Sequence, residues 1–163
     1  MLITFLRHAT AEDRSLSGAD AERALIEKGE KQLKRVAAFC RANQLLPELL
    51  YSSPLLRARQ TATLLQQKLP GCPHPHLVDW LGSDFSVSTV LAELRNLAGS
   101  GINDLWLVGH EPDFSNIIAR LLNTDAESLS IKKASLTRLD ADFSGQMSAK
   151  LLWTLPCSLM DQQ

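Results

Sequence analysis

Two arginines and two histidines stand at points of the sequence where chemistry is expected. Arg7 and His8 follow the short apolar run Leu2–Leu6, His110 follows a second such run, and Arg57 lies between them in the chain. Guanidinium groups bind phosphoryl oxygens through paired hydrogen bonds, and an imidazole nitrogen can attack phosphorus. The four residues together predict an anion pocket that contains a nucleophile.

The chemistry of such a pocket follows from the residue types. One histidine would take a phosphoryl group on an imidazole nitrogen and pass it to water. The arginines and the second histidine would stabilise the negative charge on the phosphoryl oxygens in the transition state. This scheme needs no metal and no cofactor, and the sequence shows no cluster of acidic residues to hold magnesium. We therefore expect neither at the site.

The composition of the chain narrows the class of protein. Its 163 residues fit a single domain over residues 1–163, with 45% hydrophobic and 21% charged residues. A formal net charge of −1 gives no basic field for nucleic acid. Three cysteines are too few for a disulfide framework and favour the reducing cytoplasm. The first apolar run is too short for a signal peptide, and no run approaches a membrane span.

Patterns typical of strands and helices alternate along the chain. Strands are predicted at residues 2–6, 49–52, 104–108, 134–139 and 149–154, and helices at about 19–43, from Ser53-Pro54 onward, around 91–98 and after 112. Ser53 is expected to cap its helix and Pro54 to occupy the first helical position, while residues 70–76 form a loop. The alternation predicts a three-layer α/β/α sandwich with a mixed, mostly parallel sheet. The carboxyl edge of that sheet would collect Arg7, His8 and His110, with Arg57 in reach.

The chain resembles the histidine phosphatase superfamily, and particularly its SixA-like phosphohistidine phosphatase branch. The resemblance rests on Leu6-Arg7-His8-Ala9, on residues 53–61, on Val108-Gly109-His110-Glu111-Pro112, on Arg23-Ala24-Leu25 with Gly29, and on residues 153–156. It spans nearly the whole chain. The sequence departs from the family pattern at Ala9, where glycine is usual, and at Ile26, where threonine is expected.

The resemblance implies a phosphoglycerate-mutase-like fold in which His8 is transiently phosphorylated. Arg7, Arg57 and His110 would complete the phosphate pocket, and Arg23 is a further candidate, although an arginine at a helix start is as often a solvated surface charge. Neighbours in a strand face opposite ways, so Arg7 and His8 reach one ligand only if the strand breaks its alternation there. His8 should also be neutral at the attacking nitrogen, with its other nitrogen donating to a carbonyl or carboxylate.

The proton donor for the leaving group is predicted from the family to follow the second motif. Asp79 is the nearest carboxyl group there, and the alternative is that Asp79 is a loop or capping residue. A phosphorylated imidazole leaves more easily than an alkoxide, so a phosphohistidine phosphatase tolerates a poor acid better than a phosphomonoesterase does. Asp79→Asn is accordingly expected to impair ester hydrolysis more than phosphohistidine hydrolysis.

The resemblance implies a phosphatase that acts on phosphohistidine in a histidine phosphotransfer protein of a signalling pathway. The alternative is a phosphomonoesterase for a small phosphate ester, although the chain has no long insertion to fold over a metabolite. A mutase is disfavoured for the same reason. A phosphate-binding module without turnover would be the non-enzymatic alternative, but the intact His8 argues against it. Nothing in the sequence indicates an oligomeric state.

Overall fold

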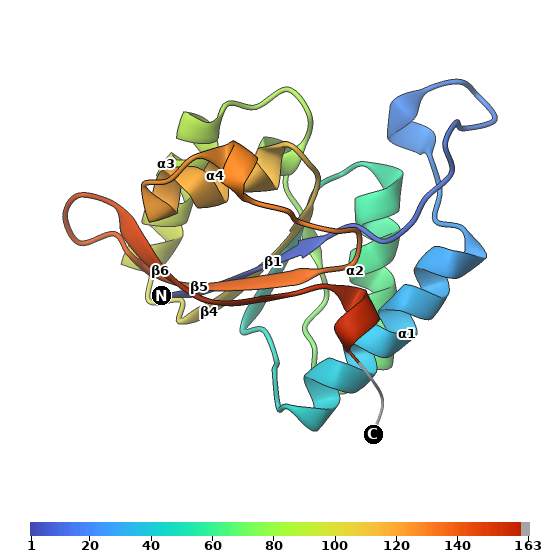
Figure 1. The fold of residues 1–163 in the computed structure, drawn as a ribbon, viewed down its shortest axis with the longest axis horizontal. Helices are drawn as coiled ribbons and strands as arrows, with labels where there is room; N and C mark the ends of the chain where they lie inside the picture. The colour runs from blue at the N-terminus through green and yellow to red at the C-terminus, as the bar shows by residue number, and fades with distance from the viewer. Residues whose placement is uncertain (161–163) are drawn as a thin grey trace.

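The computed structural model of the protein describes residues 1–160 and shows a central sheet between two layers of helices (Figure 1). The strands are β1 (Leu2–Arg7), β2 (Leu49–Ser52), β3 (His76–Leu77), β4 (Asp104–Gly109), β5 (Leu136–Asp142) and β6 (Ser148–Leu155). The α-helices are α1 (Glu27–Ala42), α2 (Leu56–Lys68), α3 (Val87–Gly99) and α4 (Asp113–Leu122). Short 3-10 turns are η1 (Asp20–Glu22), η2 (Asp79–Leu81), η3 (Ala126–Ser128) and η4 (Cys157–Leu159).

The sheet is mixed, as predicted. Its strand order is β3-β2-β4-β1-β5-β6; the first four strands are parallel, and β5 and β6 run antiparallel to their neighbours. The pairing places Arg7 opposite Gly109 and Ser52 opposite Val108. The segments that follow β1, β2 and β4 therefore leave the sheet side by side at one edge, which brings three of the sequence motifs together.

Two apolar layers hold the helices on the sheet. Leu6 of β1 packs with α1 and α2, while Ile3 and Phe5 of the same strand pack with α3 and α4. This split follows from the alternation of side chains along a strand. Trp106 is fully buried in β4, and its indole N–H donates to Asp104 Oδ1 at 3.1 Å. The core explains why β1 and β4 read as continuous apolar runs.

Helix α1 begins at Glu27, so the prediction of a helix from about residue 19 was wrong at its start. Residues 20–22 form the 3-10 turn η1, and Arg23 and Ile26 have extended backbones. Between these two residues, Leu25 forms an antiparallel bridge with Ala11 and donates its N–H to Gln60 Oε1 at 2.7 Å. The rest of the helix follows the predicted stripe. At Gly29 a β-carbon would lie 2.3 Å from the Thr10 carbonyl oxygen, so the glycine lets α1 pack on the chain that follows β1.

Helix α2 begins at Leu56, with Leu55 as its N-cap, so Ser53 and Pro54 do not open it as predicted. The Ser53 N–H donates to the Val108 carbonyl at 2.9 Å, which extends the pairing of β2 with β4 by one residue. The Ser53 hydroxyl accepts the Leu55 N–H at 3.3 Å, directly before the helix, and also lies 2.7 Å from Nε2 of His110 at the end of β4. This displacement gives Ser53 a place in the candidate site.

The predicted hairpin is confirmed, with small shifts in its bounds. Strand β5 begins at Leu136, two residues later than predicted, because Ala134 adopts a left-handed backbone with φ of 56°. The segment 70–76 is a loop up to Pro75, and His76 enters the short strand β3.

Across the part of the chain that the structure describes, no helix has the length and apolar content needed to cross a membrane.

Candidate active site

The backbone leaves regular strand geometry between Arg7 and His8. The Ala134 N–H lies 3.0 Å from the Arg7 carbonyl oxygen and 3.2 Å from the His8 carbonyl oxygen. Successive carbonyls of a regular strand point in opposite directions, so a single N–H cannot serve both. The alternation of side chains therefore ends here, which is what the Arg7-His8 pair required if both residues are to reach one ligand.

His8 carries a free nitrogen suited to nucleophilic attack. Its Nδ1 lies 2.8 Å from the Ala9 carbonyl oxygen, which can only accept, so Nδ1 carries the proton and Nε2 keeps its lone pair. Burial lowers the pKa of His8 to about 4, with the charges of Arg57, Arg7 and Lys133 adding to the effect against the Ala9 hydrogen bond. His8 is thus neutral at neutral pH.

His110 faces His8 across the sheet edge, with their ring centroids 5.2 Å apart. Its Nε2 lies 2.7 Å from the Ser53 hydroxyl, and its buried Nδ1 has no hydrogen-bond partner within residues 1–160. Burial lowers the pKa of His110 to about 3, helped by His8 and the two nearby arginines. A β-carbon at Gly109 would lie 2.7 Å from the Phe114 ring, so glycine lets the chain turn here toward α4.

Arg7 and Arg57 flank the two histidines and are only partly engaged. Arg57 Nη1 and Nη2 donate to the backbone oxygen and Oδ2 of Asp20 at 2.8 and 2.9 Å, and Arg7 Nη1 donates to the Ile131 carbonyl at 2.7 Å. The Nε atoms of both arginines are buried without a partner in the described chain. The buried Arg138, which lies in β5, has more hydrogen-bond partners: it donates to Thr4 and to both carboxylate oxygens of Asp104.

These unpartnered nitrogens indicate a place for an oxyanion. More than 90% of buried polar groups in folded proteins are hydrogen-bonded. Here three buried nitrogens without partners belong to Arg7, Arg57 and His110, all of which surround His8. We call Arg7, His8, Arg57 and His110 the basic pocket. Its donors match the oxygens of a phosphoryl group.

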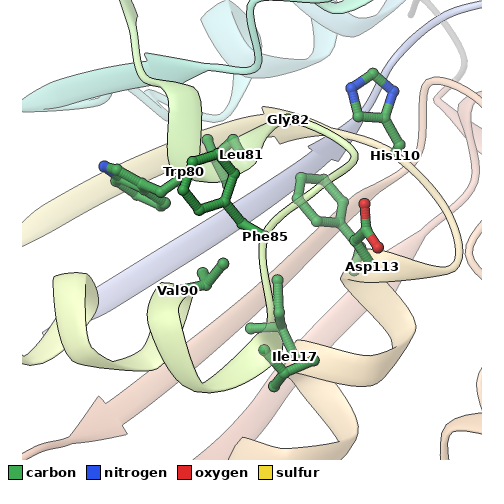
Figure 2. A pocket seen from close by; sticks show the side chains of 10 residues that line it. Trp80, Leu81, Gly82, Phe85, Val90, His110, Asp113 and Ile117 are labelled. Atoms are coloured by element: carbon green, nitrogen blue, oxygen red, sulfur yellow. The ribbon is translucent and has the colours of Figure 1, made fainter.

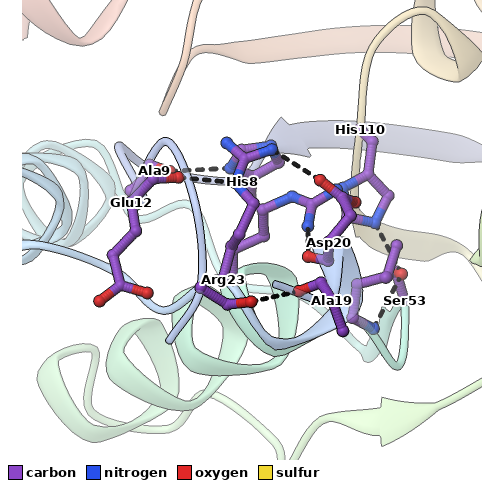
Figure 3. Close-up of polar contacts among 11 residues, drawn as sticks. His8, Ala9, Glu12, Ala19, Asp20, Arg23, Ser53 and His110 are labelled. Carbon is purple, nitrogen blue, oxygen red and sulfur yellow. Dashed lines mark hydrogen bonds and ion pairs between the residues drawn. The ribbon is translucent and has the colours of Figure 1, made fainter. Parts of the chain in front are cut away.

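Asp20 links Arg23 to the basic pocket. Its Oδ1 accepts from Arg23 Nη1 at 2.8 Å while Oδ2 accepts from Arg57, and Figure 3 shows Asp20 and Arg23 beside His8. Arg23 Nε donates to the Glu12 carbonyl at 2.6 Å. The hydrogen bond from Arg23 is the main cause that lowers the pKa of Asp20. Arg23 therefore lies at the rim of the pocket and reaches Arg57 through a shared carboxylate.

Comparison with known proteins identifies the family of the chain. The sequence profile of the histidine phosphatase superfamily (branch 1) matches residues 3–85. An uncharacterized protein of Picosynechococcus sp. is 36% identical over 140 residues, which cover 85% of this chain and 84% of the relative. This chain belongs to the histidine phosphatase superfamily. The matched residues 3–85 include Arg7, His8 and Arg57 of the basic pocket, whereas His110 lies outside the match.

Solved structures extend the match over the whole fold. The protein histidine phosphatase SixA, determined with tungstate, has a TM-score of 0.89 at 20% identity, covering 99% of this chain and 100% of that one. A mycobacterial glucosyl-3-phosphoglycerate phosphatase has a TM-score of 0.71 at 18% identity, covering 92% and 96%. At these identities the structures show that the histidine phosphatase fold is shared.

Asp79, the predicted proton donor, is exposed at the start of η2. A cleft next to the basic pocket shares His110 with it. Asp79 is not among the residues that line this cleft. We call this the apolar cleft; its lining includes Trp80, Leu81, Phe85, Val90, Ile117 and the two polar residues His110 and Asp113 (Figure 2). The structure brings together Arg7, His8, Arg57 and His110, sets Arg23 at the rim, and leaves Asp79 outside.

Three features of the site were not anticipated from the sequence. Asp20 holds Arg57, Ser53 contacts His110, and the charge of Lys133 reaches His8. The spacing of Asp20 and Arg23, three residues apart, is the one signal that could have indicated an ion pair. Within residues 1–160, no group of three or more His, Cys, Asp or Glu side chains is arranged to hold a metal ion.

Proposed function

We propose that the protein is a metal-independent phosphatase that uses His8 as a nucleophile and removes phosphoryl groups from phosphohistidine in a signalling protein. The observation that carries the proposal is the neutral His8, with its Nε2 lone pair free, surrounded by unpartnered nitrogens of Arg7, Arg57 and His110. Membership of the histidine phosphatase superfamily and the phosphatase folds that the chain matches support a phosphatase.

The first step forms a phosphoryl-enzyme intermediate. The His8 Nε2 lone pair attacks phosphorus, while the bond to the leaving group breaks and its electron pair departs with that group. Arg7 and Arg57 present their Nε–H groups to the phosphoryl oxygens, and the His110 ring lies close enough to add a further donor. These fixed charges stabilise the transition state and take the part that a metal ion has in other phosphatases.

The second step returns His8 to its starting state. A water oxygen bonds to phosphorus, the phosphorus–nitrogen bond breaks, and its electron pair returns to Nε2. The hydrogen bond from Nδ1 to the Ala9 carbonyl holds the ring in one orientation through both steps. The Ala9 N–H in turn donates to Thr61 Oγ1 at 3.1 Å, so α2 fixes the chain beside the nucleophile.

Phosphohistidine in a histidine phosphotransfer protein is the proposed substrate because of the fold. The match to the protein histidine phosphatase SixA covers 99% of this chain and 100% of that one. His8, Arg57 and His110 are buried, but the side chain of Asp20, which contacts Arg57, is 63% exposed, so a side chain carried on another protein can approach. We place the protein in the cytoplasm, a proposal supported by its three buried cysteines, none of which is in a disulfide.

A small-molecule phosphomonoesterase is the second candidate function, and the apolar cleft is the observation that favours it. Trp80 and Phe85 are the more exposed apolar residues near His110, and they offer a surface against which the body of a small phosphate ester packs. The fold is also shared with a glucosyl-3-phosphoglycerate phosphatase.

The proposal is tested by comparing the wild type with His8→Ala on three substrates, each with and without a chelator. The substrates are a phosphohistidine-bearing phosphotransfer domain, p-nitrophenyl phosphate and a panel of phosphorylated metabolites. We expect turnover of phosphohistidine to exceed that of the esters, to disappear in His8→Ala, and to be insensitive to chelator. Loss of activity with chelator contradicts the metal-independent mechanism, and a preferred metabolite selects the second candidate.

A further inference from the structure

The apolar cleft contains a carboxyl group that the two steps above leave unused. Asp113 and His110 are the titratable residues among the ten that line the cleft. The chain turns tightly between them, since the Phe114 N–H donates to the His110 carbonyl at 2.9 Å. Figure 2 shows both side chains at the same end of the cleft, opposite Trp80. Asp113 therefore stands beside a residue of the basic pocket.

Helix α4 does not need Asp113 as a cap. Glu111 fills that role, because its Oε1 accepts from the Ser115 N–H at 3.2 Å and its Oε2 accepts from the Ser115 hydroxyl at 2.5 Å. The Asp113 carboxyl group accepts no hydrogen bond from any residue between 1 and 160, although it lies in the first turn of the helix. Its side chain is half-buried and directed into the cleft.

The surroundings of Asp113 disfavour the charged form of its carboxyl group. Burial raises the pKa of Asp113, and the negative charge of Glu111 adds to the effect. The other titratable group of the cleft, His110, is neutral and offers no compensating positive charge. The side chains that face Asp113 from η2, the following loop, α3 and α4 are apolar: Trp80, Leu81, Phe85, Val87, Val90 and Ile117. A bound phosphoryl dianion would raise the pKa of Asp113 further.

We propose that Asp113 is the proton donor to the leaving group, in an inference that rests on the phosphatase reaction proposed above. As His8 Nε2 bonds to phosphorus, the bond to the leaving group breaks and its electron pair stays on the leaving atom, which is an imidazole nitrogen in phosphohistidine and an oxygen in an ester. That atom takes the proton of the Asp113 carboxyl group, and the leaving group departs as a neutral imidazole or alcohol. Asp113 is left as a carboxylate.

In the second step, the Asp113 carboxylate acts as a base. It takes a proton from the attacking water as the oxygen bonds to phosphorus, while the phosphorus–nitrogen electron pair returns to His8. Inorganic phosphate is released and Asp113 is protonated again, so the proton balance closes over one turnover. His110 is a weaker donor, since burial lowers its pKa and leaves it neutral, and Asp79 is not among the residues that line the cleft.

The test compares Asp113→Asn with Asp79→Asn, the matched change at the sequence-predicted position. Phenyl phosphate has a leaving group that needs a proton, whereas 2,4-dinitrophenyl phosphate has one that does not. General acid catalysis contributes about 100-fold or more to rate. For Asp113→Asn we expect a loss of about 100-fold in kcat/KM on phenyl phosphate and less than about threefold on the dinitrophenyl ester. Asp79→Asn should leave both values near those of the wild type.

Two further measurements make the outcome decisive. The wild-type rate on phenyl phosphate should fall as pH rises through the pKa of Asp113, and this fall should be absent in Asp113→Asn. An equal loss on both esters overturns the assignment and gives Asp113 a structural role, while a selective loss in Asp79→Asn transfers the role to Asp79. If the wild type forms no phosphoryl-enzyme at His8, the proposed function fails and Asp113 loses its role with it. Phosphorylation of His8 together with an equal loss overturns the role of Asp113 alone.

Discussion

The basic pocket and the apolar cleft meet at His110 but are built on opposite principles. In the basic pocket, buried nitrogens of Arg7, Arg57 and His110 are left without partners in the described chain, and fixed positive charges surround His8. In the apolar cleft, Trp80 and its neighbours leave a single carboxyl group in apolar surroundings. In the reaction that we propose, the two regions divide two tasks: charge stabilisation on the phosphoryl group and proton transfer to the leaving group.

The largest effect on kcat/KM in this series is expected from a change at Arg57, and its size should not depend on the leaving group. Arg57→Ala removes a donor aimed at the phosphoryl oxygens, so kcat/KM should fall about 1,000-fold on phenyl and dinitrophenyl phosphate alike. Arg57→Lys keeps the charge without the paired geometry and should recover part of the loss. A loss confined to phenyl phosphate would break the division of tasks between the two regions.

The second prediction concerns the free energy of unfolding, because the basic pocket holds His8 in its neutral form. The pKa of His8 is about 4 in the folded protein against an ordinary value of 6.5, so the unfolded chain takes up the proton first as pH falls. Stability from this group is complete above pH 6.5 and is lost between pH 6.5 and pH 4, by about 3 kcal/mol. Urea unfolding at pH 7.5 and pH 4 should show a smaller loss for His8→Asn than for the wild type. Equal losses would mean that His8 is not held neutral.

The third prediction addresses His110, where the two regions meet. Ser53→Ala removes the hydroxyl 2.7 Å from His110 Nε2 and should lower kcat/KM by about fivefold, the value of one hydrogen bond. The neighbouring Ser52→Ala, whose hydroxyl donates to a backbone carbonyl at 3.0 Å, is the control and should leave kcat/KM unchanged. The same loss in both variants would indicate a disturbed β2 and no specific role for Ser53.

The smallest effect is expected in the apolar cleft. Phe85 is 44% exposed, so its ring becomes more buried when a substrate packs against it. Phe85→Ala should raise KM for phenyl phosphate about threefold through lost apolar contact. Inhibition by inorganic phosphate, which occupies the basic pocket alone, should not change. Weaker inhibition by phosphate would show that the two regions are not separate.

The basic pocket was largely predictable from the sequence, because Arg7, His8 and His110 follow strands whose apolar runs are plain. Parallel strands then force their carboxyl ends to one edge, and the motif around Arg57 completes the set. The break in alternation at Arg7 was also a necessary consequence of having two functional neighbours. The Ala134 N–H that contacts two successive carbonyls supplies it.

The remainder depended on contacts that no local pattern encodes. Asp20 lies in the short 3-10 turn η1, which has no periodic apolar pattern, so its contact with Arg57 could not be anticipated. Asp113 in a first helical turn has the pattern of a capping residue, and only the hydrogen bonds of Glu111 show that the cap is already made. Asp79 follows the second motif at a plausible distance, but it is exposed and is not among the residues that line the cleft.

Direct detection of phosphorylated His8 tests the central claim most sharply. The wild type is mixed with 2,4-dinitrophenyl phosphate, quenched in alkali to preserve a phosphorus–nitrogen bond, and mapped by peptide mass spectrometry. We predict an alkali-stable, acid-labile phosphoryl group on His8 that is absent in His8→Asn. Turnover by the wild type with no phosphoryl group on His8, or with one on another residue, would contradict the account.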